Sequence, residues 1–502
     1  MVLKRLFANN LVLLTFFLCL SEFAFSKDWN KSFVRVTTYI QEPDIDAPWR
    51  TKSVREEVHM GTVMDAGHIL VSAYVVAHSK NFEFQLIGDS KRHPLQLAMV
   101  DYNINLALLR PVDPKSLQGL KPVSIGDDLS LGEEAHVYTA RDGQRLIQAP
   151  LRLREVVVQS ALFSPYQLPS YAFDTQKKSA GWSEPIIKKQ SLVGMTVSKR
   201  DETVFGMPAS VIKRFYAEAI RDHYRALPRL GLVIEPLNSP ELREYSGLKP
   251  DQHGVWIGLV QKNSPFYGAL QAHDVLVQVD QTVLNDQGLF QHPKWGAMSF
   301  IGALYQYYEG DRLELKVVRN GKLLSFTKVL EKYDPNEDLM PWNTPRDEPY
   351  LIFGGLLFQE LSQSFLKKWG SRWRERAPSH LLMLWNYSNF RQEDEQKRLI
   401  ILNRVLADSM NKGYDKLKNL QLLSVNGRKV HSLQDLSQTL SQLATDSAEK
   451  FAVFRFAPYN QQVILSFDDI KPAHQRIVSN YEVRDQIGIW QEQEKTAIVS
   501  PN

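Results

Sequence analysis

The sequence of 502 residues contains one cysteine, Cys19, and this cysteine lies in an apolar run near the N-terminus. A chain with a single thiol forms no internal disulfide and offers no set of thiolates for a structural zinc site. If the segment that carries Cys19 is removed, no cysteine nucleophile remains. The cysteine count therefore excludes a disulfide scaffold, a thiolate metal site and a cysteine-dependent enzyme.

The chain also lacks an excess of charge of either sign. It has 60 Lys and Arg against 56 Asp and Glu, which gives a formal net charge of +4, and the charges are interspersed. No basic stripe of the kind that tracks a phosphate backbone is present, so nucleic acid is not expected as a partner. The 12 histidines are dispersed and no H-E-x-x-H motif occurs, so we expect no metal and no other cofactor.

Long hydrophobic runs are absent after the N-terminus. There, Lys4 and Arg5 precede the run "LVLLTFFLCL" (residues 11–20), and Ala24 and Ser26 follow it at a cleavage-site spacing. This order is typical of a signal peptide of residues 1–26 that is cut after Ser26. An uncleaved anchor is the alternative, although the run is shorter than the roughly 20 residues that span a bilayer. We therefore expect a periplasmic or secreted protein without a membrane span once the segment is removed.

Short strand patterns fill residues 31–226. In "FEFQL" the apolar Phe82, Phe84 and Leu86 alternate with polar residues, as in a half-buried strand, and similar segments recur between Gly, Asp, Asn and Pro clusters. Many short strands at such spacing indicate an all-β barrel or sandwich. The period changes after Pro208, where Val211, Phe215 and Ile220 predict one apolar face of a helix that closes this domain.

The remainder of the chain reads as two α+β modules. The first, residues 229–332, contains Asn320-Gly321 between two strand patterns, a strong hairpin signal. Within it, the segment 295–308 is rich in aromatic residues and predicts a helix that buries Phe300, Leu304 and Tyr308, with a contact surface as the alternative. Residues 333–348 are acidic and rich in proline, which indicates a linker. We place the second module at 349–472 and a polar tail at 473–502.

Several of these segments resemble the HtrA/Deg family of trypsin-like serine proteases, in its plant-type branch. The resemblance rests on "APWR" (residues 47–50), on "FGMPASVIKRF" before the predicted helix, on "VQKNSPFYGALQAHDVLVQVD" in the first module and on "ADSMNKGYDKLKNLQLLSVNGRKV" in the second. His273 stands where the family usually has glycine. The resemblance implies a trypsin-like double β-barrel followed by two PDZ domains.

The family's catalytic residues are replaced at all three positions. The segment "ILVSAYVV" places Tyr74 where the family has its histidine, and "DYNINLALL" places Asn105 at the aspartate position. In "DTQKKSAGWSEP", which has the length of the family's nucleophile loop, Trp182 stands for the serine. Because a phenol is a poor base at neutral pH and an amide carries no charge, the sequence predicts a pseudoprotease.

Two further replacements in this loop, a hypothesis about Tyr74 and Asn105, and one alternative complete the prediction. Ala180 replaces the loop's leading glycine, and Glu184 replaces another glycine and brings a side chain next to the oxyanion loop. As a hypothesis, the Tyr74 hydroxyl and the Asn105 amide form a neutral hydrogen bond in place of the His–Asp contact. The alternative is an active endopeptidase in which Ser183, one residue from the expected position, acts as a shifted nucleophile with His68 or His78 as its base.

If the protease activity is lost, the resemblance still implies a peptide-binding function. PDZ domains take an extended peptide by β-augmentation and hold its C-terminal carboxylate on a backbone loop. The corresponding loops here are Arg229, Leu230, Gly231 and Leu232 in the first module and Phe353, Gly354, Gly355 and Leu356 in the second. We expect unfolded proteins or peptide C-termini as ligands. In this branch the second PDZ domain is implicated in assembly, so a homo-oligomer (a trimer or a multiple) or assembly with active relatives is expected. A structural remnant without binding remains the alternative.

Overall fold

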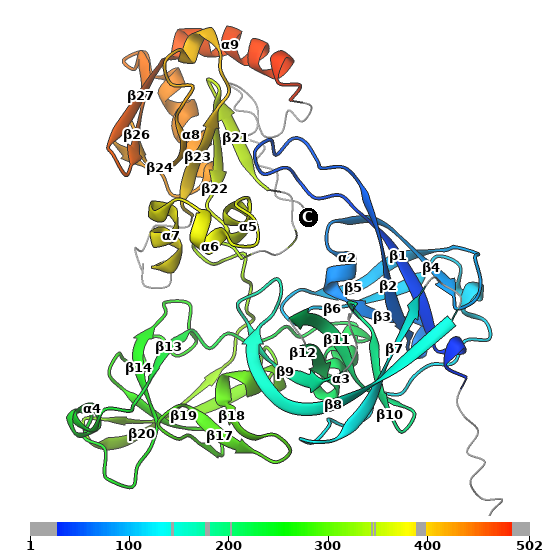
Figure 1. The fold of residues 1–502 in the computed structure, drawn as a ribbon. Coiled ribbons are helices and arrows are strands. Elements are labelled where there is room, and N and C mark those ends of the chain that lie inside the picture. Colours follow the sequence, from blue (N-terminus) through cyan, green and yellow to red (C-terminus); the bar gives the residue numbers. More distant parts are fainter. Residues whose placement is uncertain are drawn as a thin grey trace, which may run out of the picture.

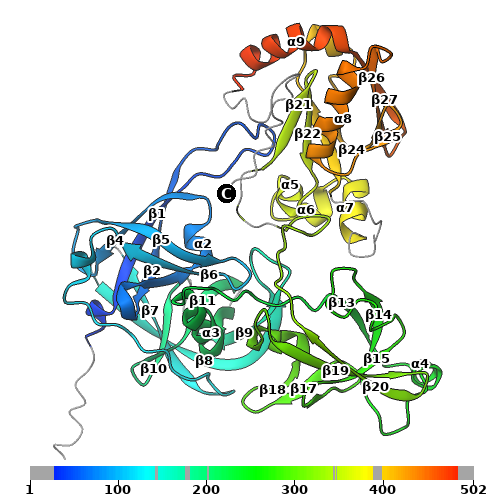
Figure 2. The ribbon, with the colours of Figure 1, turned by 180° about the vertical axis from the view of Figure 1, so that it is seen from behind.

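A computed structural model describes residues 28–141, 145–175, 181–200, 203–342, 345, 348–387 and 398–483. The predicted signal peptide and Ala180 lie outside these residues, as does the part of the predicted tail from residue 484 onward. Figures 1 and 2 show three parts: a double barrel, a first module beside its lower half and a second module above both. No helix in the described residues has the length and apolar character needed to cross a membrane.

The first barrel is a closed sheet with the strand order β1-β2-β3-β6-β5-β4. Phe82, Phe84 and Leu86 all contact its core, as their alternation predicts. Its elements are η2 (Trp29–Lys31), β1 (Phe33–Ile40), β2 (Arg55–Val63), η3 (Asp65–Gly67), β3 (Ile69–Ser72), α2 (Ala73–Val76), β4 (Ser79–Leu86), β5 (His93–Asp101), β6 (Leu106–Pro111) and η4 (Pro114–Leu117).

The second barrel is also closed, with the order β10-β11-β12-β9-β8-β7, so the fold is the predicted all-β double barrel. Its strands are β7 (Glu134–Arg141), β8 (Arg145–Ser160), β9 (Gln167–Asp174), β10 (Pro185–Lys188), β11 (Ser191–Arg200) and β12 (Thr203–Pro208). The predicted helix follows as α3 (Ala209–Ala219) and buries Val211 and Phe215. Ile220 was wrongly placed on that buried face: it lies beyond the last turn and is 52% exposed.

The first module has a sheet with the order β13-β14-β15-β19-β20, in which β16 also pairs with β15. The predicted Asn320-Gly321 turn joins β19 to β20, and both residues have the positive φ (50° and 72°) that such a turn requires. Its elements are β13 (Leu232–Pro236), α4 (Pro240–Tyr245), β14 (Val255–Val260), β15 (Val275–Val279), β16 (Thr282–Val283), β17 (Leu289–His292), β18 (Gly296–Ser299), η5 (Phe300–Gln306), β19 (Arg312–Arg319) and β20 (Lys322–Val329).

The segment 295–308 differs from its prediction. It contains the strand β18, which forms a hairpin with β17, and then the 3₁₀ helix η5 in place of an α-helix. Phe300 and Leu304 are buried as expected, but Tyr308 lies outside the core, beneath the guanidinium groups of two arginines. The α-helical period failed because a strand with its own partner takes up the start of the segment.

This hairpin and η5 dock the first module onto the second barrel. Trp295 is 5% exposed in the core of that barrel, and its Nε1 donates a hydrogen bond to the carbonyl oxygen of Leu129 at 2.9 Å. A Cβ added to Gly302 would lie 2.4 Å from a methyl group of Val158, so the backbone of η5 lies directly against β8. The module is therefore fixed to the barrel through a well-packed contact.

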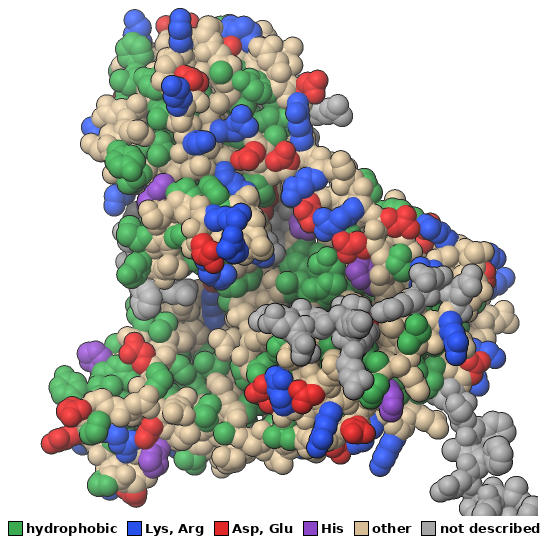
Figure 3. Space-filling model, viewed as in Figure 1, with side chains coloured by type: hydrophobic (Ala, Val, Ile, Leu, Met, Phe, Trp, Pro, Cys, Tyr) green, Lys and Arg blue, Asp and Glu red, His purple; other side chains and the backbone are tan. Residues whose placement is uncertain are grey.

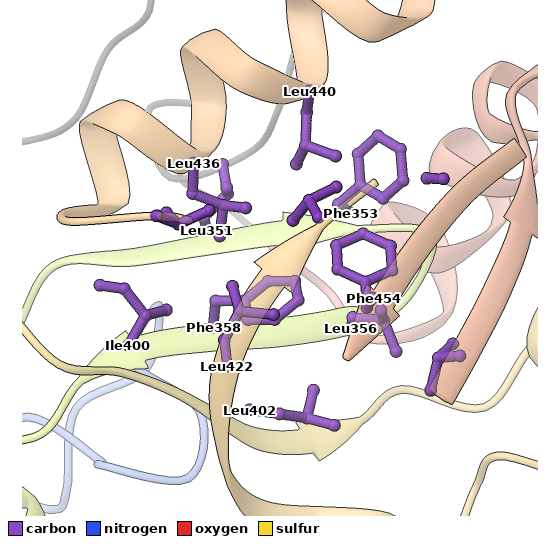
Figure 4. Packing of buried hydrophobic residues seen from close by; sticks show 14 of the residues in the cluster. Leu351, Phe353, Leu356, Phe358, Ile400, Leu402, Leu422, Leu436, Leu440 and Phe454 are labelled. Carbon is purple, nitrogen blue, oxygen red and sulfur yellow. The ribbon is translucent and has the colours of Figure 1, made fainter. Parts of the chain in front are cut away.

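The second module is built on a sheet with the order β21-β22-β23-β24-β26-β27, in which β25 also pairs with β24. Helix α8 covers one face of it, as Figure 4 shows for Leu436 and Leu440. The elements are β21 (Tyr350–Phe353), β22 (Leu356–Glu360), α5 (Gln363–Lys367), α6 (Trp373–Arg376), α7 (Ser379–Asn386), β23 (Ile400–Val405), η7 (Ser409–Asn411), β24 (Lys418–Val425), β25 (Arg428–Lys429), α8 (Leu433–Thr445), β26 (Phe451–Ala457), β27 (Gln461–Ser466) and α9 (Phe467–Asn480).

The predicted end of this module at residue 472 was wrong. Helix α9 continues through Pro472, and Ala473, Ile477 and Val483 are buried together with Tyr350 from β21. Ala473 and Ile477 follow one another at a helical spacing of four, which the polar residues between them obscure in the sequence. The predicted linker, 333–348, contains no helix or strand in its described part, yet it is not loose, because Met340 is buried among α5–α7.

A long connection between β1 and β2, residues 41–54 (the arm), reaches from the first barrel to the second module (Figures 1 and 2). Trp49 Nε1 donates to the carbonyl oxygen of Tyr481 at 3.2 Å, and the Trp49 ring lies 5.9 Å from that of Tyr350. Asn403 Nδ2 donates to the carbonyl oxygen of Ile45 at 2.8 Å. The arm therefore ties two parts of the chain that are more than three hundred residues apart in sequence.

Replacing Trp295 tests the docking of the first module. We expect Trp295→Ala to lower the free energy of unfolding by about 3–5 kcal/mol, because it removes a large buried ring and leaves a cavity. It should also raise the radius of gyration in small-angle X-ray scattering, since the hairpin loses its anchor in the barrel. The control is Trp256→Ala, which empties a cluster inside the first module. An equal radius of gyration for wild type and Trp295→Ala would contradict the docking role.

Candidate functional site

The three positions aligned with the triad come together in the structure. Tyr74 lies on α2 directly after β3, Asn105 directly precedes β6, and Trp182 lies in the turn before β10. The rings of Tyr74 and Trp182 are stacked, with centroids 4.5 Å apart and planes 18° from parallel. The backbone N–H of Tyr74 donates to Asn105 Oδ1 at 3.2 Å. The sequence therefore located the site correctly, although its side chains contact one another differently from the hypothesis.

The hypothesised hydrogen bond between the Tyr74 hydroxyl and the Asn105 side chain is absent from these described residues. Asn105 Oδ1 instead accepts from Ser72 Oγ at 3.0 Å, in addition to the Tyr74 backbone N–H. The Tyr74 hydroxyl lies 3.5 Å from Glu57 Oε1. The hypothesis failed because stacking on the indole fixes the phenol ring and directs its hydroxyl toward β2, whereas Asn105 is buried beside the backbone of α2.

The surroundings of Tyr74 make its deprotonated, proton-accepting form even rarer at neutral pH than in a free phenol. Burial, followed by the neighbouring Glu57, raises the pKa of the Tyr74 hydroxyl above its usual value near 10. A group of this kind stays protonated at neutral pH and accepts no proton from a nucleophile. The ring of His59 packs edge-on against Tyr74, with centroids 5.8 Å apart.

The alternative nucleophile, Ser183, is inside the protein. It is 0% exposed, and its Oγ accepts a hydrogen bond from the backbone N–H of Ser72 at 2.7 Å. Its backbone N–H donates to the carbonyl oxygen of Thr196, and its φ is +66°. The hydroxyl therefore joins the two barrels across the cleft floor. The structure corrects the expectation of a shifted nucleophile, because a substrate carbonyl cannot reach this oxygen without opening the contact.

Glu184 occupies the loop as its replacement of glycine predicts. It is 4% exposed, and one carboxyl oxygen would lie 3.3 Å from a Cβ added to Gly181. Thr196 Oγ1 donates to the carbonyl oxygen of Gly181 at 2.7 Å and accepts from the Glu184 backbone N–H at 3.0 Å. A carboxyl group and a satisfied backbone thus fill the space beside the loop that would have to hold an oxyanion.

Two cavities flank the stacked rings. One, of about 90 Å³, is lined by Trp182 and Asn105 together with residues of β8 and β9. This volume is far below the roughly 300–1,000 Å³ of ligand pockets. The other, of about 340 Å³, lies between Tyr74 and α5 of the second module, where burial and Arg374 lower the pKa of Lys367 to about 8. The second module therefore lies next to Tyr74 on one side of the cleft.

The predicted loop of the first module, Arg229–Leu232, directly precedes β13. The carbonyl oxygens of Leu230 and Gly231 point inward, where they accept from Ser264 Oγ at 2.6 Å and from the Gln261 backbone N–H at 2.9 Å. Gly231 needs to be glycine, since its φ is +65° and a Cβ would lie 2.7 Å from the Cβ of Ser264.

Arg229 has a different role from the one expected. Its side chain is 9% exposed, pairs with Asp338 and lies over the ring of Tyr333, with its guanidinium carbon 4.8 Å from the ring centroid. It therefore fixes the start of the linker against the loop and is not free to contact a peptide. In the sequence Arg229 and Asp338 are too far apart for a pattern to reveal the pairing.

The second predicted loop, Phe353–Leu356, is closed to a ligand, which corrects the prediction. It is a tight buried turn that joins β21 to β22. A Cβ at Gly354 would lie 2.6 Å from Leu465, and one at Gly355 would lie 2.2 Å from Asn411. Strand β22 is paired with β21 on one side and with β23 on the other. The module's own chain therefore occupies the place next to β22 where a peptide would add, as Figure 4 shows for Leu351 and Phe353 beneath α8.

Comparison with known proteins identifies the architecture. A family model described as PDZ domain matches residues 342–488. "Protease Do-like 2, chloroplastic" of Arabidopsis thaliana is 23% identical over 459 residues, covering 88% of this chain and 72% of the relative. "Putative protease Do-like 11, mitochondrial" of the same plant is also 23% identical, over 91% of this chain and 75% of the relative. The chain belongs to the HtrA/Deg family.

Among solved structures, "HtrA-type protease AlgW with decapeptide" is 16% identical, covers 61% of this chain and 97% of its own, and superposes with a TM-score of 0.46. The double barrel followed by a PDZ region is the architecture of the HtrA/Deg family. This HtrA/Deg chain places an aromatic stack and a buried serine in the cleft between its barrels. Sequence reasoning missed the contacts of the arm, for which the sequence carries no signal beyond the "APWR" segment.

The role of Ser183 is open to a direct test. We expect Ser183→Ala to lower the free energy of unfolding by about 1–3 kcal/mol, because the buried N–H of Ser72 loses its acceptor. Urea-induced unfolding, followed by intrinsic tryptophan fluorescence, measures the change. Ser183→Gly also lacks the hydroxyl but adopts the φ of +66° without strain, so comparing it with Ser183→Ala separates the lost hydrogen bond from backbone strain. Unchanged stability in Ser183→Ala would show that the hydroxyl does not hold the two barrels together.

Proposed function

We propose that this HtrA/Deg protein is a pseudoprotease that binds extended peptide segments through its first module. The observation that carries the first half is the stack of Tyr74 on Trp182. Acyl transfer requires a nucleophile within hydrogen-bond reach of a base. Here the base position holds a phenol with a raised pKa, and the nucleophile position holds an indole, which offers no nucleophilic oxygen. The burial of Ser183 supports the same conclusion.

The binding half rests on the edge of the first module. Among the described strands, β13 pairs with β14 and with no other, so no described strand covers its second edge. An extended peptide gains main-chain hydrogen bonds by adding to such an edge, and pockets for alternate side chains select its sequence. The preceding loop turns the carbonyl oxygens of Leu230 and Gly231 inward. The N–H groups of the same two peptide units therefore point the other way, where they could bind the carboxylate of a ligand.

Several apolar side chains of the first module are only partly buried. Leu230, Leu232 and Ile234 are partly buried against its core, together with Phe290 from the hairpin and Ile301 from η5. Such half-buried groups suit the apolar side chains of an unfolded chain, which favours a role in protein quality control as a holder or scaffold. From the signal-like N-terminus we place this role in the periplasm or outside the cell. A homo-oligomer, or assembly with active relatives, belongs to the same proposal.

Incubation with unfolded casein tests the loss of catalysis. We expect residues 27–502 to leave casein intact over a day, while an active HtrA/Deg protease cuts it in a parallel reaction. Ser183→Ala is the control for contamination, since fragments that persist in that variant come from another protease. Fragments that vanish in Ser183→Ala would overturn the pseudoprotease half of the proposal.

Peptide binding is tested by fluorescence anisotropy with a labelled decapeptide that ends in valine. We expect saturable binding that weakens at least tenfold in Ile234→Lys, because a charge would stand beside the edge of β13. Leu324→Lys replaces a similarly half-buried residue on β20, the opposite edge of the same sheet, and should bind as wild type does. The same peptide with an amidated C-terminus tests the carboxylate loop. Failure of the wild type to bind up to about 1 mM peptide would refute the binding half.

A further inference from the structure

A cavity of about 710 Å³ lies where the arm meets the second module. It is distinct from the cleft between the barrels and from the loop before β13. It falls within the size range of small-molecule sites, roughly 300–1,000 Å³. Its wall combines Asp46 of the arm and Lys368 and Trp369, at and beyond the end of α5, with residues of β23, of the turn before β24 and of β24 itself.

The charged groups of this wall are mostly cationic. Four basic side chains line it, Lys368, Arg404, Lys416 and Lys418, against two acidic ones, Asp46 and Asp415. In the whole sequence the two signs are nearly balanced, so this excess is local. A cavity lined by one sign of charge with low-dielectric walls concentrates ions of the opposite sign.

Two of these basic residues are direct neighbours on adjacent strands. Arg404 on β23 and Lys418 on β24 are direct register partners. Like charges placed opposite one another on neighbouring strands destabilise the pairing. Folding alone gives no reason for this arrangement, because an uncharged or acidic residue at either position would remove the cost. An anion bound between the two groups would convert the repulsion into attraction.

Lys368 is the most buried of the four basic residues and is held by oxygen atoms. Its Nζ donates to Asp46 Oδ1 at 3.1 Å, to Asn403 Oδ1 at 2.9 Å and to Asn419 Oδ1 at 2.8 Å, and its side chain is 13% exposed. Burial lowers the pKa of Lys368, and Lys418 and Arg404 act in the same direction, while Asp46 opposes them. The acidic group that compensates this cluster therefore comes from the arm.

We propose that this cavity binds a small multivalent oxyanion, a compound with two or more phosphate or carboxylate groups. Arg404 and Lys418 hold its anionic oxygens, and Lys416 contributes at the wall. Trp369 gives the cavity an apolar surface next to these groups. Asp46 opposes the ligand by its charge, and because Asp46 belongs to the arm, occupation of the cavity is coupled to the contact between the first barrel and the second module.

Calorimetry with inorganic pyrophosphate, on the full-length mature protein at constant ionic strength, tests the proposal. Arg404→Gln and Lys418→Gln should each weaken binding about three- to tenfold, as the loss of one nearby charge does. Asp46→Asn should tighten it by a similar factor, because it removes a repelling charge. Because these expected changes in affinity have opposite directions, they distinguish a specific site from a loss of folding. A loss of folding would weaken binding in every variant. Circular dichroism checks that each variant is folded.

Lys429→Gln, an exposed charge change on β25 of the same module, is the matched control and should bind as wild type does. Citrate in place of pyrophosphate distinguishes carboxylate from phosphate, and binding of either supports the site. Equal weakening in Lys429→Gln, no heat with either anion, or binding restricted to anionic lipid vesicles or to an acidic peptide would each overturn the proposal.

Discussion

Backbone hydrogen bonding at the edges of sheets is the constraint on which this architecture depends. Every strand needs partners for its N–H and C=O groups, and an edge that lacks them is open to another chain. The two barrels meet this need by closing on themselves. In the second module β21 supplies the partner for β22 from within the chain. In the first module the strand that follows the predicted loop, β13, has a described partner on one side only, whereas β22, which follows the second loop, has partners on both sides; the binding proposal therefore falls on β13.

The cleft between the barrels contains structural contacts at the three positions that align with the family's triad. Aromatic stacking of Tyr74 and Trp182 gives the facing positions a contact worth about 0.5–1.5 kcal/mol beyond the area it buries. Ser183 then joins the floor of the cleft through the backbone of Ser72, and Asn105 holds the N–H of Tyr74. The side chains in this part of the cleft therefore contribute to the contact between the two barrels.

Contacts between distant segments position the three parts of the molecule. The hairpin β17–β18 inserts Trp295 into the second barrel, and the arm carries Trp49 and Asp46 to the second module. The first contact is apolar and closely packed, whereas the second combines a ring contact with a buried ammonium group and its oxygen acceptors. Because the second depends on charge, it is the one that an ion can influence. Figure 3 shows basic and acidic side chains interspersed over one face of the molecule, so the basic cavity is a local departure from that balance.

The sequence by itself determined those features that depend on local pattern and on short motifs. Alternation predicted the strand at Phe82–Leu86, the Asn320-Gly321 pair predicted its hairpin, and the motif spacing located Tyr74, Asn105 and Trp182. The tertiary structure alone decided where the polar groups of three candidate site residues point. The hydroxyl of Tyr74 points toward Glu57, the hydroxyl of Ser183 into the contact between the barrels, and the guanidinium of Arg229 toward Asp338. It also decided that Phe353–Leu356 is buried and that α9 belongs to the second module. Each of these outcomes depends on a partner far away in the chain, and the energy of such a pairing has no counterpart in local sequence.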